Sequence, residues 1–366
     1  MSLKKIAWLF GLPLLLFAGI VFFLYWYNLG DISHKHEPWS SFGSLLSGVF
    51  TLVGAGATIG TLLYLSNQNK EMQKVTQAQL DTLTFERYIN HRKLFTDQLN
   101  ELVATHKNTF RFRDPSHLYT SIFPMNSPHH CEFSVPPAYD ENGDGTNHVG
   151  LLYRKLERIK ASLDLATPDA DDVDQLVHGL MDLSYDLLMI EPIGNRRVGD
   201  VMFLNSAYGF NIFALNEFID PAVKIANMIF KFTNNPVIDG QPIQGNSYFV
   251  EEAMLKVFFP VRKNYPLNVF NNIIGLDILI SVFMISQNLH EGNDLLFRDT
   301  VNLLRQKLFS VEAVNGLAVK ENFDDVLNVC CNEVAQRLLI MTPQDDHYNE
   351  AVEVDRRLTF LISRNG

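Results

Sequence analysis

Two long uncharged stretches near the start of the chain constrain its fold more than any other feature. The first, "IAWLFGLPLLLFAGIVFFLYWY", covers residues 6–27, and the second covers about residues 42–65. Each is about as long as a helix must be to cross the hydrocarbon core of a bilayer. The first stretch ends in aromatic residues, which are typical of a membrane interface and not of a signal-peptide cleavage site. We therefore expect an N-terminal two-helix transmembrane hairpin in residues 1–68; two buried helices of a soluble protein are the alternative.

The charges around these stretches predict their orientation. The lysines that flank the pair of spans are Lys4, Lys5, Lys70 and Lys74. The loop between the spans has one lysine, Lys35, against Asp31 and Glu37. Because positive charge favours the cytoplasmic side, we expect both termini and the chain beyond residue 68 in the cytoplasm. The chain has three cysteines and no disulfide framework, which suits this reducing compartment.

Small residues are frequent in the second stretch, which contains Gly43, Gly48, Gly54, Gly56 and Gly60. Helices in lipid associate where small residues let their backbones approach closely. Ser44 and Gly48 are four residues apart, as are Gly56 and Gly60, so each pair lies on one face of a helix. We predict that these four residues form a membrane-helix interface, with nearby threonines, Thr58 and Thr61, able to form hydrogen bonds between helices. The partner is either a second copy of the chain or the first span of the same chain.

Residues 69–110 contain no proline or glycine and are rich in Gln, Leu, Glu and Lys. Their leucines recur at mostly helical spacings, which predicts a long cytoplasmic helical stalk that continues the second span. The heptad pattern is too irregular to predict a coiled coil.

Neither span contains an acidic or basic side chain, which argues against a proton relay or an ion-coupled carrier.

Residues 111–366 are expected to form a mainly helical cytoplasmic domain, and the whole chain is assigned to the mainly α class. An irregular, loop-rich insert is predicted at about residues 111–150, where Pro, Asn, Gly and Asp are dense. Thr167 is the predicted N-cap of a helix with Pro168 at its first position. A loop or hairpin is predicted at 234–250. The other helices are expected from Leu151, and over Asn211–Thr233, Val269–Asn288, Asn293–Phe309 and Phe323–Met341.

No motif in the chain predicts catalysis, a metal or a cofactor. A P-loop, a Rossmann glycine pattern and a G-x-S-x-G elbow are all missing from the sequence. The run "DENGDGTNHVGL" begins like a calcium loop, but its twelfth position is Leu151 where a glutamate is needed, which favours a simple turn. Three residues with zinc-ligand chemistry lack paired spacing: His117, His129 and Cys131. The acids of Asp169–Asp174 suit the first turn of a helix.

The chain as a whole has a net charge of −11, and this acidic balance argues against a general nucleic-acid binder. One short region is nevertheless basic. Between Arg87 and Arg113, basic residues alternate with aromatic ones. Two interpretations stay open: attraction to anionic lipid headgroups, or contact with a nucleic acid or an acidic partner through charge and ring stacking. The candidate contact residues are Arg92, Lys93, Phe110, Arg111, Arg113 and Tyr119.

Two N-terminal spans, a Gln-rich stalk and the stretches "ERYINHRKLFTDQL" and "LYTSIFPMN" resemble the two-transmembrane effector proteins of bacterial retron anti-phage systems. These belong to a broader group of phage abortive-infection membrane proteins. The resemblance covers the architecture of the chain, and its specific part is about residues 40–126.

The resemblance implies an effector held inactive by a retron reverse transcriptase and its multicopy RNA–DNA hybrid. When a phage disturbs a host DNA-repair nuclease, such an effector is released and damages the inner membrane before progeny mature. The small-residue faces of the second stretch lead us to expect a homo-oligomer in the active state. A membrane-anchored enzyme of unknown chemistry and a non-toxic signalling scaffold are the alternatives.

Overall fold

The computed structural model describes residues 3–29, 34–107, 109–204, 206–238, 247–259 and 267–365. The described chain is mainly helical, which confirms the predicted fold class. It divides into two compact units, Met1–Leu83 (unit 1) and Thr84–Gly366 (unit 2).

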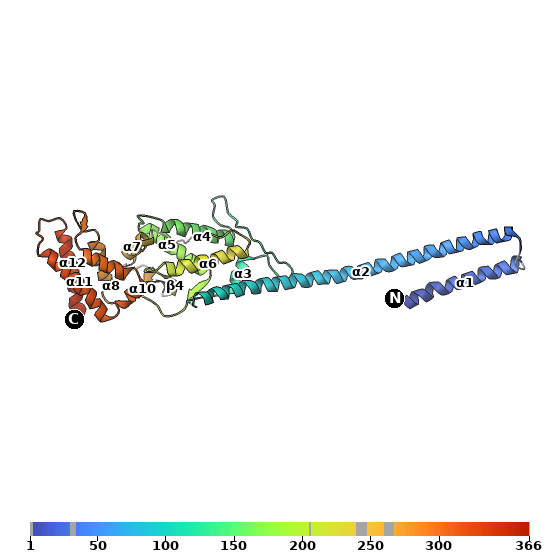
Figure 1. Ribbon diagram of the computed structural model, residues 1–366, viewed down its shortest axis with the longest axis horizontal. Coiled ribbons are helices and arrows are strands. Elements are labelled where there is room, and N and C mark those ends of the chain that lie inside the picture. Colours follow the sequence, from blue (N-terminus) through green and yellow to red (C-terminus); the bar gives the residue numbers. More distant parts are fainter. Residues whose placement is uncertain are drawn as a thin grey trace. The chain divides into compact units, whose positions relative to one another are not determined.

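Unit 1 contains helix α1 (Leu3–Leu29) and the first part of helix α2 (His36–Thr105). The two run in opposite directions (Figure 1). Near their joined ends, the ring of Phe42 lies 4.6 Å from that of Tyr25 and 5.5 Å from that of Phe22, measured between centroids. Helix α1 covers the first predicted span and continues through Pro13.

Helix α2 contains 70 residues and joins the second predicted span to the predicted stalk without a break. The sequence permits an unbroken helix because its proline lies in the first turn, where proline is tolerated. Each glycine lowers helix stability by only about 1 kcal/mol. The helix ends at Thr105 and not at residue 110, and Lys107 follows with a left-handed φ of 56°.

The last part of α2 belongs to unit 2 and is packed into its core. His91, Phe95 and Leu99 are buried and are spaced four residues apart, so they form one face of the helix. Rings of Tyr119 and Phe232 pack against Phe95 at 5.6 and 5.2 Å between centroids.

The predicted loop-rich region contains two short regular elements. Strand β1 (Phe110–Phe112) is followed by helix α3 (Pro115–Ile122), whose N-cap Asp114 accepts a hydrogen bond from the amide of His117. Helix α4 (His148–Leu163) then begins after its own N-cap, Asn147.

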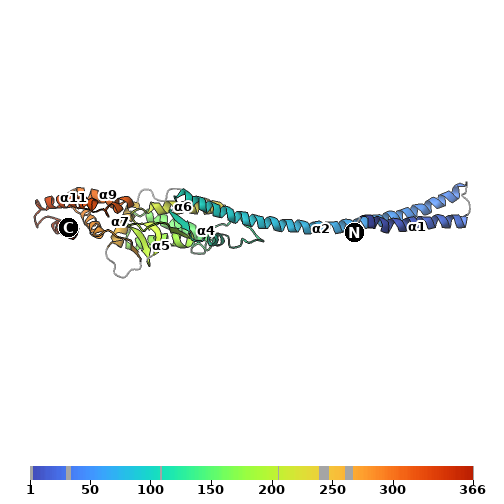
Figure 2. The ribbon, with the colours of Figure 1, turned by 90° about the horizontal axis from the view of Figure 1, so that it is seen from below.

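In unit 2, α4 packs against both α5 (Ala170–Asp182) and α6 (Asn216–Phe232) (Figures 1 and 2). The N-cap of α5 is Asp169 and not Thr167, so that prediction is wrong. Asp169 and Asp172 form a capping box, each side chain accepting a hydrogen bond from the other's backbone amide, which satisfies two exposed donors together. A π-helical turn, η1 (Leu183–Leu187), extends α5.

Short strands were not predicted, and they account for most of the errors in helix boundaries. Strand β1 pairs with β2, a second sheet has the order β4-β3-β5, and β6 pairs with β7. The helix predicted from Asn211 therefore begins later, since β4 ends at that residue. The remaining strands are β2 (Ile190–Pro192), β3 (Asp200–Phe203), β4 (Ser206–Asn211), β5 (Leu267–Val269), β6 (His290–Glu291) and β7 (Asp294–Leu295).

The C-terminal part of unit 2 is a cluster of helices in which α8, α9, α11 and α12 contact one another (Figure 1). Helix α8 begins after Gly275, later than predicted. Gly275 has a φ of +85°, and a Cβ there would collide with Leu361 of α12. The elements are α8 (Leu276–Ser286), α9 (Arg298–Leu308), α10 (Val311–Gly316), α11 (Lys320–Leu338) and α12 (Tyr348–Asn365).

The loop or hairpin predicted at 234–250 lies partly outside the described residues, which omit 239–246. Its last residues instead belong to helix α7 (Ser247–Phe258). Helices α10 and α12 were not predicted.

Candidate functional site

Among the described residues, α2 is the helix long and apolar enough to cross a membrane. An 18-residue window of it has a mean hydropathy of 1.7, and none of that window is buried. A helix of this composition in the core of a soluble protein would be largely covered by its neighbours. Large apolar side chains of α2 are instead exposed, among them Leu52 (74%), Leu63 (68%) and Phe50 (61%).

The four predicted interface residues of α2 fall on two different faces. The partly buried positions recur every three or four residues, and they are Phe42, Leu46, Val49, Val53, Gly56 and Gly60. Phe42 contacts α1, so Gly56 and Gly60 lie on the face turned to α1. Ser44 and Gly48 are exposed on another face.

Three of the hydroxyl groups in the apolar part of α2 donate hydrogen bonds inside the helix. Thr58 and Thr61 donate to the carbonyls four residues earlier, at 2.8 and 2.9 Å. Ser44 donates in the same way to the carbonyl of Ser40 at 3.1 Å. These protons are therefore not directed at another helix, contrary to the role expected for the threonines.

The basic segment is held by partners within unit 2. Arg92 of α2 donates through Nη2 to Ser116 Oγ of α3 at 2.8 Å, whereas Lys93 is exposed. On β1, Arg111 forms an ion pair with Glu191, which lies opposite it in the β1–β2 register. The Arg111 side chain is still 68% exposed, so this pair adds little stability and leaves the guanidinium accessible.

Arg113 makes the most specific arrangement of the segment. Its guanidinium lies 3.5 Å from the centroid of the Tyr185 ring and also donates a hydrogen bond to the Tyr185 carbonyl. Tyr185 is half exposed in the π-helical turn η1, and the ring of Tyr208 lies 5.9 Å away. The exposed aromatic group beside the arginines is thus Tyr185, which sequence reasoning missed because it lies far along the chain.

Phe110 and Tyr119 were predicted as stacking surfaces, and that prediction is wrong. They are 7% and 0% exposed. Phe110 points inward because alternate residues of a strand face opposite sides, which leaves the arginine next to it outside. The Tyr119 hydroxyl is hydrogen bonded to His91 Nδ1 at 2.8 Å and to Asn126 at 3.1 Å inside the core.

His91, on the buried face of α2, is enclosed by aromatic rings. The rings of Phe232, Phe123 and Phe133 have centroids 4.5, 4.8 and 4.9 Å from that of His91. Burial lowers the pKa of His91, so the imidazole is neutral at pH 7. The cluster has the properties of a structural support for α2 and not of a proton-transfer site.

A cleft of about 830 Å³ in unit 2 adjoins the basic segment. The end of α2, the β1–β2 ribbon with its following loop, and the start of α6 form its walls. The charged residues that line it are Lys107, Arg196, Arg197 and Lys224, against Glu191, Asp200, Glu217 and Asp220. Arg197 is paired with Glu217 at 2.7 Å. Because the charges balance, the cleft is better suited to a polar protein surface than to a polyanion.

His106 lies in the wall of this cleft. Its pKa is lowered, first by burial and second by Lys224, while Asp220 acts in the opposite direction. Its Nε2 atom is buried and has no hydrogen-bond partner among the described residues.

The described residues contain no group of three or more His, Cys, Asp or Glu side chains that could hold a metal ion. His117 and His129 are exposed and Cys131 is half-buried. In the calcium-like stretch, the Asp140 carboxylate accepts hydrogen bonds from the amides of Asn142 and Asp144 at 2.9 and 2.8 Å, which is the geometry of a turn.

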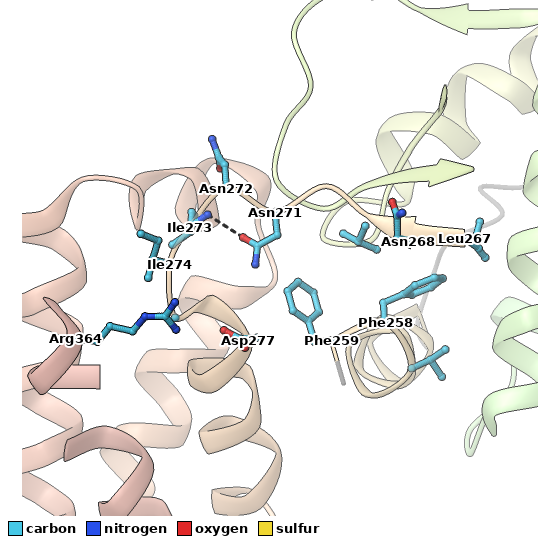
Figure 3. A pocket seen from close by; sticks show the side chains of 13 residues that line it. Phe258, Phe259, Leu267, Asn268, Asn271, Asn272, Ile273, Ile274, Asp277 and Arg364 are labelled. Atoms are coloured by element: carbon cyan, nitrogen blue, oxygen red, sulfur yellow. Dashed lines mark hydrogen bonds between the residues drawn. The ribbon is translucent and has the colours of Figure 1, made fainter. Parts of the chain in front are cut away.

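A second cavity, of about 500 Å³, lies between α7, β5 and the start of α8 (Figure 3). Its lining combines the rings of Phe258 and Phe259 with Asp277 and Arg364 (Figure 3). The stretch 260–266, which joins Phe259 to β5, lies outside the described residues, so we assign no ligand to this cavity.

Comparisons of the chain with protein-family models, with curated proteins and with solved structures found no match.

Proposed function

We propose that the chain is a membrane-anchored toxic effector of a retron anti-phage defence system. In this proposal α1 and the first part of α2 form a transmembrane hairpin in the inner membrane, with spans at about 6–27 and 42–65 and both termini in the cytoplasm. The observation that carries the membrane anchoring is the apolar window of α2, none of which is buried, and the assignment to a retron system rests on the resemblance of the sequence.

The energetics of that window favour lipid over water. Exposed apolar surface costs about 25 cal/mol per Å² in water and nothing comparable in a hydrocarbon medium. Side chains such as Leu52 and Leu63, which are more than two-thirds exposed, would each contribute to that cost. The lysines outside both ends of the pair of spans support the orientation.

The exposed pair Ser44 and Gly48 is the proposed contact with a second copy in the active oligomer. Gly56 and Gly60 lie on the face turned to α1, which makes α1 the proposed neighbour of that pair, although a Cβ at either glycine would meet no atom within 4 Å among the described residues. A change at Gly48 therefore separates assembly from folding of the hairpin more cleanly than a change at Gly56.

The resting complex with reverse transcriptase and RNA–DNA hybrid is proposed to use the exposed basic residues Lys93, Arg111 and Arg113, together with the half-buried Arg92. Tyr185 takes the stacking role that Phe110 and Tyr119 cannot fill. The Arg113–Tyr185 pair supports this assignment, since a cation on an exposed ring offers both a charge and a flat apolar surface.

Topology is the first test. A reporter fused after Gly366 should report a cytoplasmic position, and one inserted at His34 a periplasmic position. The reverse pattern would refute the orientation, and recovery of the full chain in the soluble fraction would refute membrane anchoring.

Toxicity is the second test. Expression of the chain alone should depolarise the membrane, and co-expression with the reverse transcriptase and its RNA should prevent it. Membrane-anchored protein without depolarisation would favour the signalling scaffold.

The partner surface is tested by Arg113→Gln together with Lys93→Gln. Loss of charge-assisted contacts should weaken co-purification with the retron components and increase toxicity in their presence. Arg356→Gln, on α12, is the matched surface control. Attachment of these residues to lipid headgroups predicts the opposite result, a less toxic variant.

A further inference from the structure

The part of α2 in unit 1 that follows the predicted span is amphipathic. Its large exposed apolar side chains are Met72 (60%), Val75 (57%), Leu80 (52%) and Leu83 (48%). At about 100° per residue, these four positions fall within about 140° of the helix circumference. The charged residues centred on the opposite side are Lys70, Lys74 and Asp81, and Asp81 there accepts a hydrogen bond from Gln77 at 2.9 Å.

Helix α1 is too short to cover this apolar face. It has 27 residues, so an antiparallel pairing that starts at His36 brings its other end to about residue 62 of α2. The face from Met72 to Leu83 therefore remains uncovered by the chain's own first helix.

The heptad pattern is irregular over residues 69–110 as a whole, but residues 65–83 can be placed in one register of a seven-residue repeat. With Asn69 in an a position, Thr76 and Leu83 follow in a, while Leu65, Met72 and Gln79 occupy d. Val75 then falls in g and Leu80 in e, five residues apart. That is the offset at which g and e residues of two parallel helices meet.

The surface of α2 has a depression at this repeat. Its lining includes Asn69, Met72, Gln73 and Thr76, together with the neighbouring Gln77. The first four stand at i, i+3, i+4 and i+7, the set of residues that receives one side chain of a facing helix in a coiled coil.

We infer that residues 65–83 of α2 form a parallel two-stranded coiled coil with a second copy of this chain. Three of the six seam positions are polar, and they decide the occupant: Asn69, Thr76 and Gln79. Against lipid or an unrelated apolar helix these side chains would be left without partners, whereas in a parallel, in-register pair each faces its identical counterpart. The parallel orientation rests on the proposed function, because two copies inserted in one membrane point the same way.

Disulfide trapping of the full chain tests the inference. Met72→Cys, in the seam, is compared with Lys74→Cys, on the opposite side, in membranes and in detergent-purified protein. The native chain, which keeps its three cysteines, gives the baseline. Oxidation should give at least roughly five-fold more covalent dimer from Met72→Cys than from Lys74→Cys.

A second change separates pairing from chance collision. Leu83→Glu places a charge in the seam and should lower the dimer yield of Met72→Cys roughly five-fold, whereas Asp81→Lys, on the polar face, should not. Equal yields at positions 72 and 74 overturn the inference, as does a yield that Leu83→Glu leaves unchanged.

The membrane and detergent samples keep this inference distinct from the proposed function. Failure of membrane anchoring appears as soluble protein, and the detergent sample still reports the pairing. If position 72 gives no dimer and its thiol is protected from a water-soluble maleimide only in membranes, the face belongs to lipid and the inference is wrong.

Discussion

The two units place their apolar side chains in opposite environments. Unit 2 encloses residues such as Leu118 and Phe283, which are 0% exposed. Unit 1 leaves residues such as Phe50 and Leu52 more than 60% exposed. Unit 2 thus surrounds a continuous apolar core, whereas the described chain leaves large apolar side chains of unit 1 uncovered.

The glycines of the two units also differ in whether neighbouring atoms leave room for a side chain. A Cβ at Gly150 of α4 would overlap the carbonyl oxygen of Ala138, so unit 2 requires glycine there for close packing. A Cβ at Gly48 or Gly54 of α2 would meet no atom within 4 Å among the described residues. The glycines of the span are therefore not required by packing within the described chain.

The largest effect on stability is expected in α2, whose side chains are exposed at Phe85 and buried at Phe95. Phe95→Ala removes a fully buried ring and should lower the free energy of unfolding of unit 2 by about 3–5 kcal/mol. Phe85→Ala, on the same helix but 49% exposed, should change it by less than about 0.5 kcal/mol. Thermal unfolding of the detergent-solubilised chain measures both. Similar losses would mean that the core of unit 2 extends further along α2.

Introducing a charged side chain tests whether the exposed apolar surface of unit 1 contacts lipid. Leu52→Lys should oppose membrane insertion by about 3 kcal/mol, because a lysine at the centre of a span is costly. The measurement is the fraction of chain that resists alkaline extraction from membranes. Leu94→Lys, at an exposed position of α2 in unit 2, is the control and should extract like the native chain. Equal behaviour of the two variants would remove the distinction between the units.

The glycine comparison predicts a smaller difference. Gly150→Ala should destabilise unit 2 by about 1–3 kcal/mol, because the backbone of Ala138 cannot rotate away from the added methyl group. Gly54→Ala should cause no loss, since the methyl group enters open space and alanine favours a helix. A stable Gly150→Ala variant in thermal unfolding would contradict the packing argument.

The smallest effect concerns a carboxyl group that unit 2 holds away from water. Burial raises the pKa of Glu251 in α7 to about 7, against a hydrogen bond from the Leu215 backbone that lowers it. The native state therefore keeps this proton between about pH 4.5 and 7 while the unfolded state loses it, so this carboxyl lowers stability as pH rises through that range. Glu251→Gln should be more stable than the native chain at pH 8, with no gain at pH 4.5. A pH-independent difference would show that the side chain is hydrated.

Prediction from sequence succeeded for the long helices and failed where distant segments meet. The uncharged runs and the lack of strong breakers were enough to place α1 and most of α2, since these are local properties. The α5 cap was misplaced by two residues because Thr167 and Asp169 are both good caps and the reciprocal bond with Asp172 decides between them. Strands of two to six residues carry too little periodicity to be recognised.

For the candidate site, the sequence identified the arginines but not their surroundings. The alternation in "FRFR" does contain the signal that Phe110 and Phe112 point to the side opposite Arg111 and Arg113. The contact between Arg113 and Tyr185 has no such signal, because only the folded core brings η1 beside β1.

The internal hydrogen bonding of the α2 hydroxyls has a consequence for recognition. Ser44, Thr51, Thr58 and Thr61 all donate to the carbonyl one turn earlier, so the span presents no free polar proton at these positions. At these four positions a neighbouring helix is then selected by surface relief, through the hollows over small residues and the ridges of large ones. Recognition of this kind depends on the volume of each side chain and not on its chemical type. Substitution of a hydroxyl by a group of equal size should be tolerated where a larger apolar group is not.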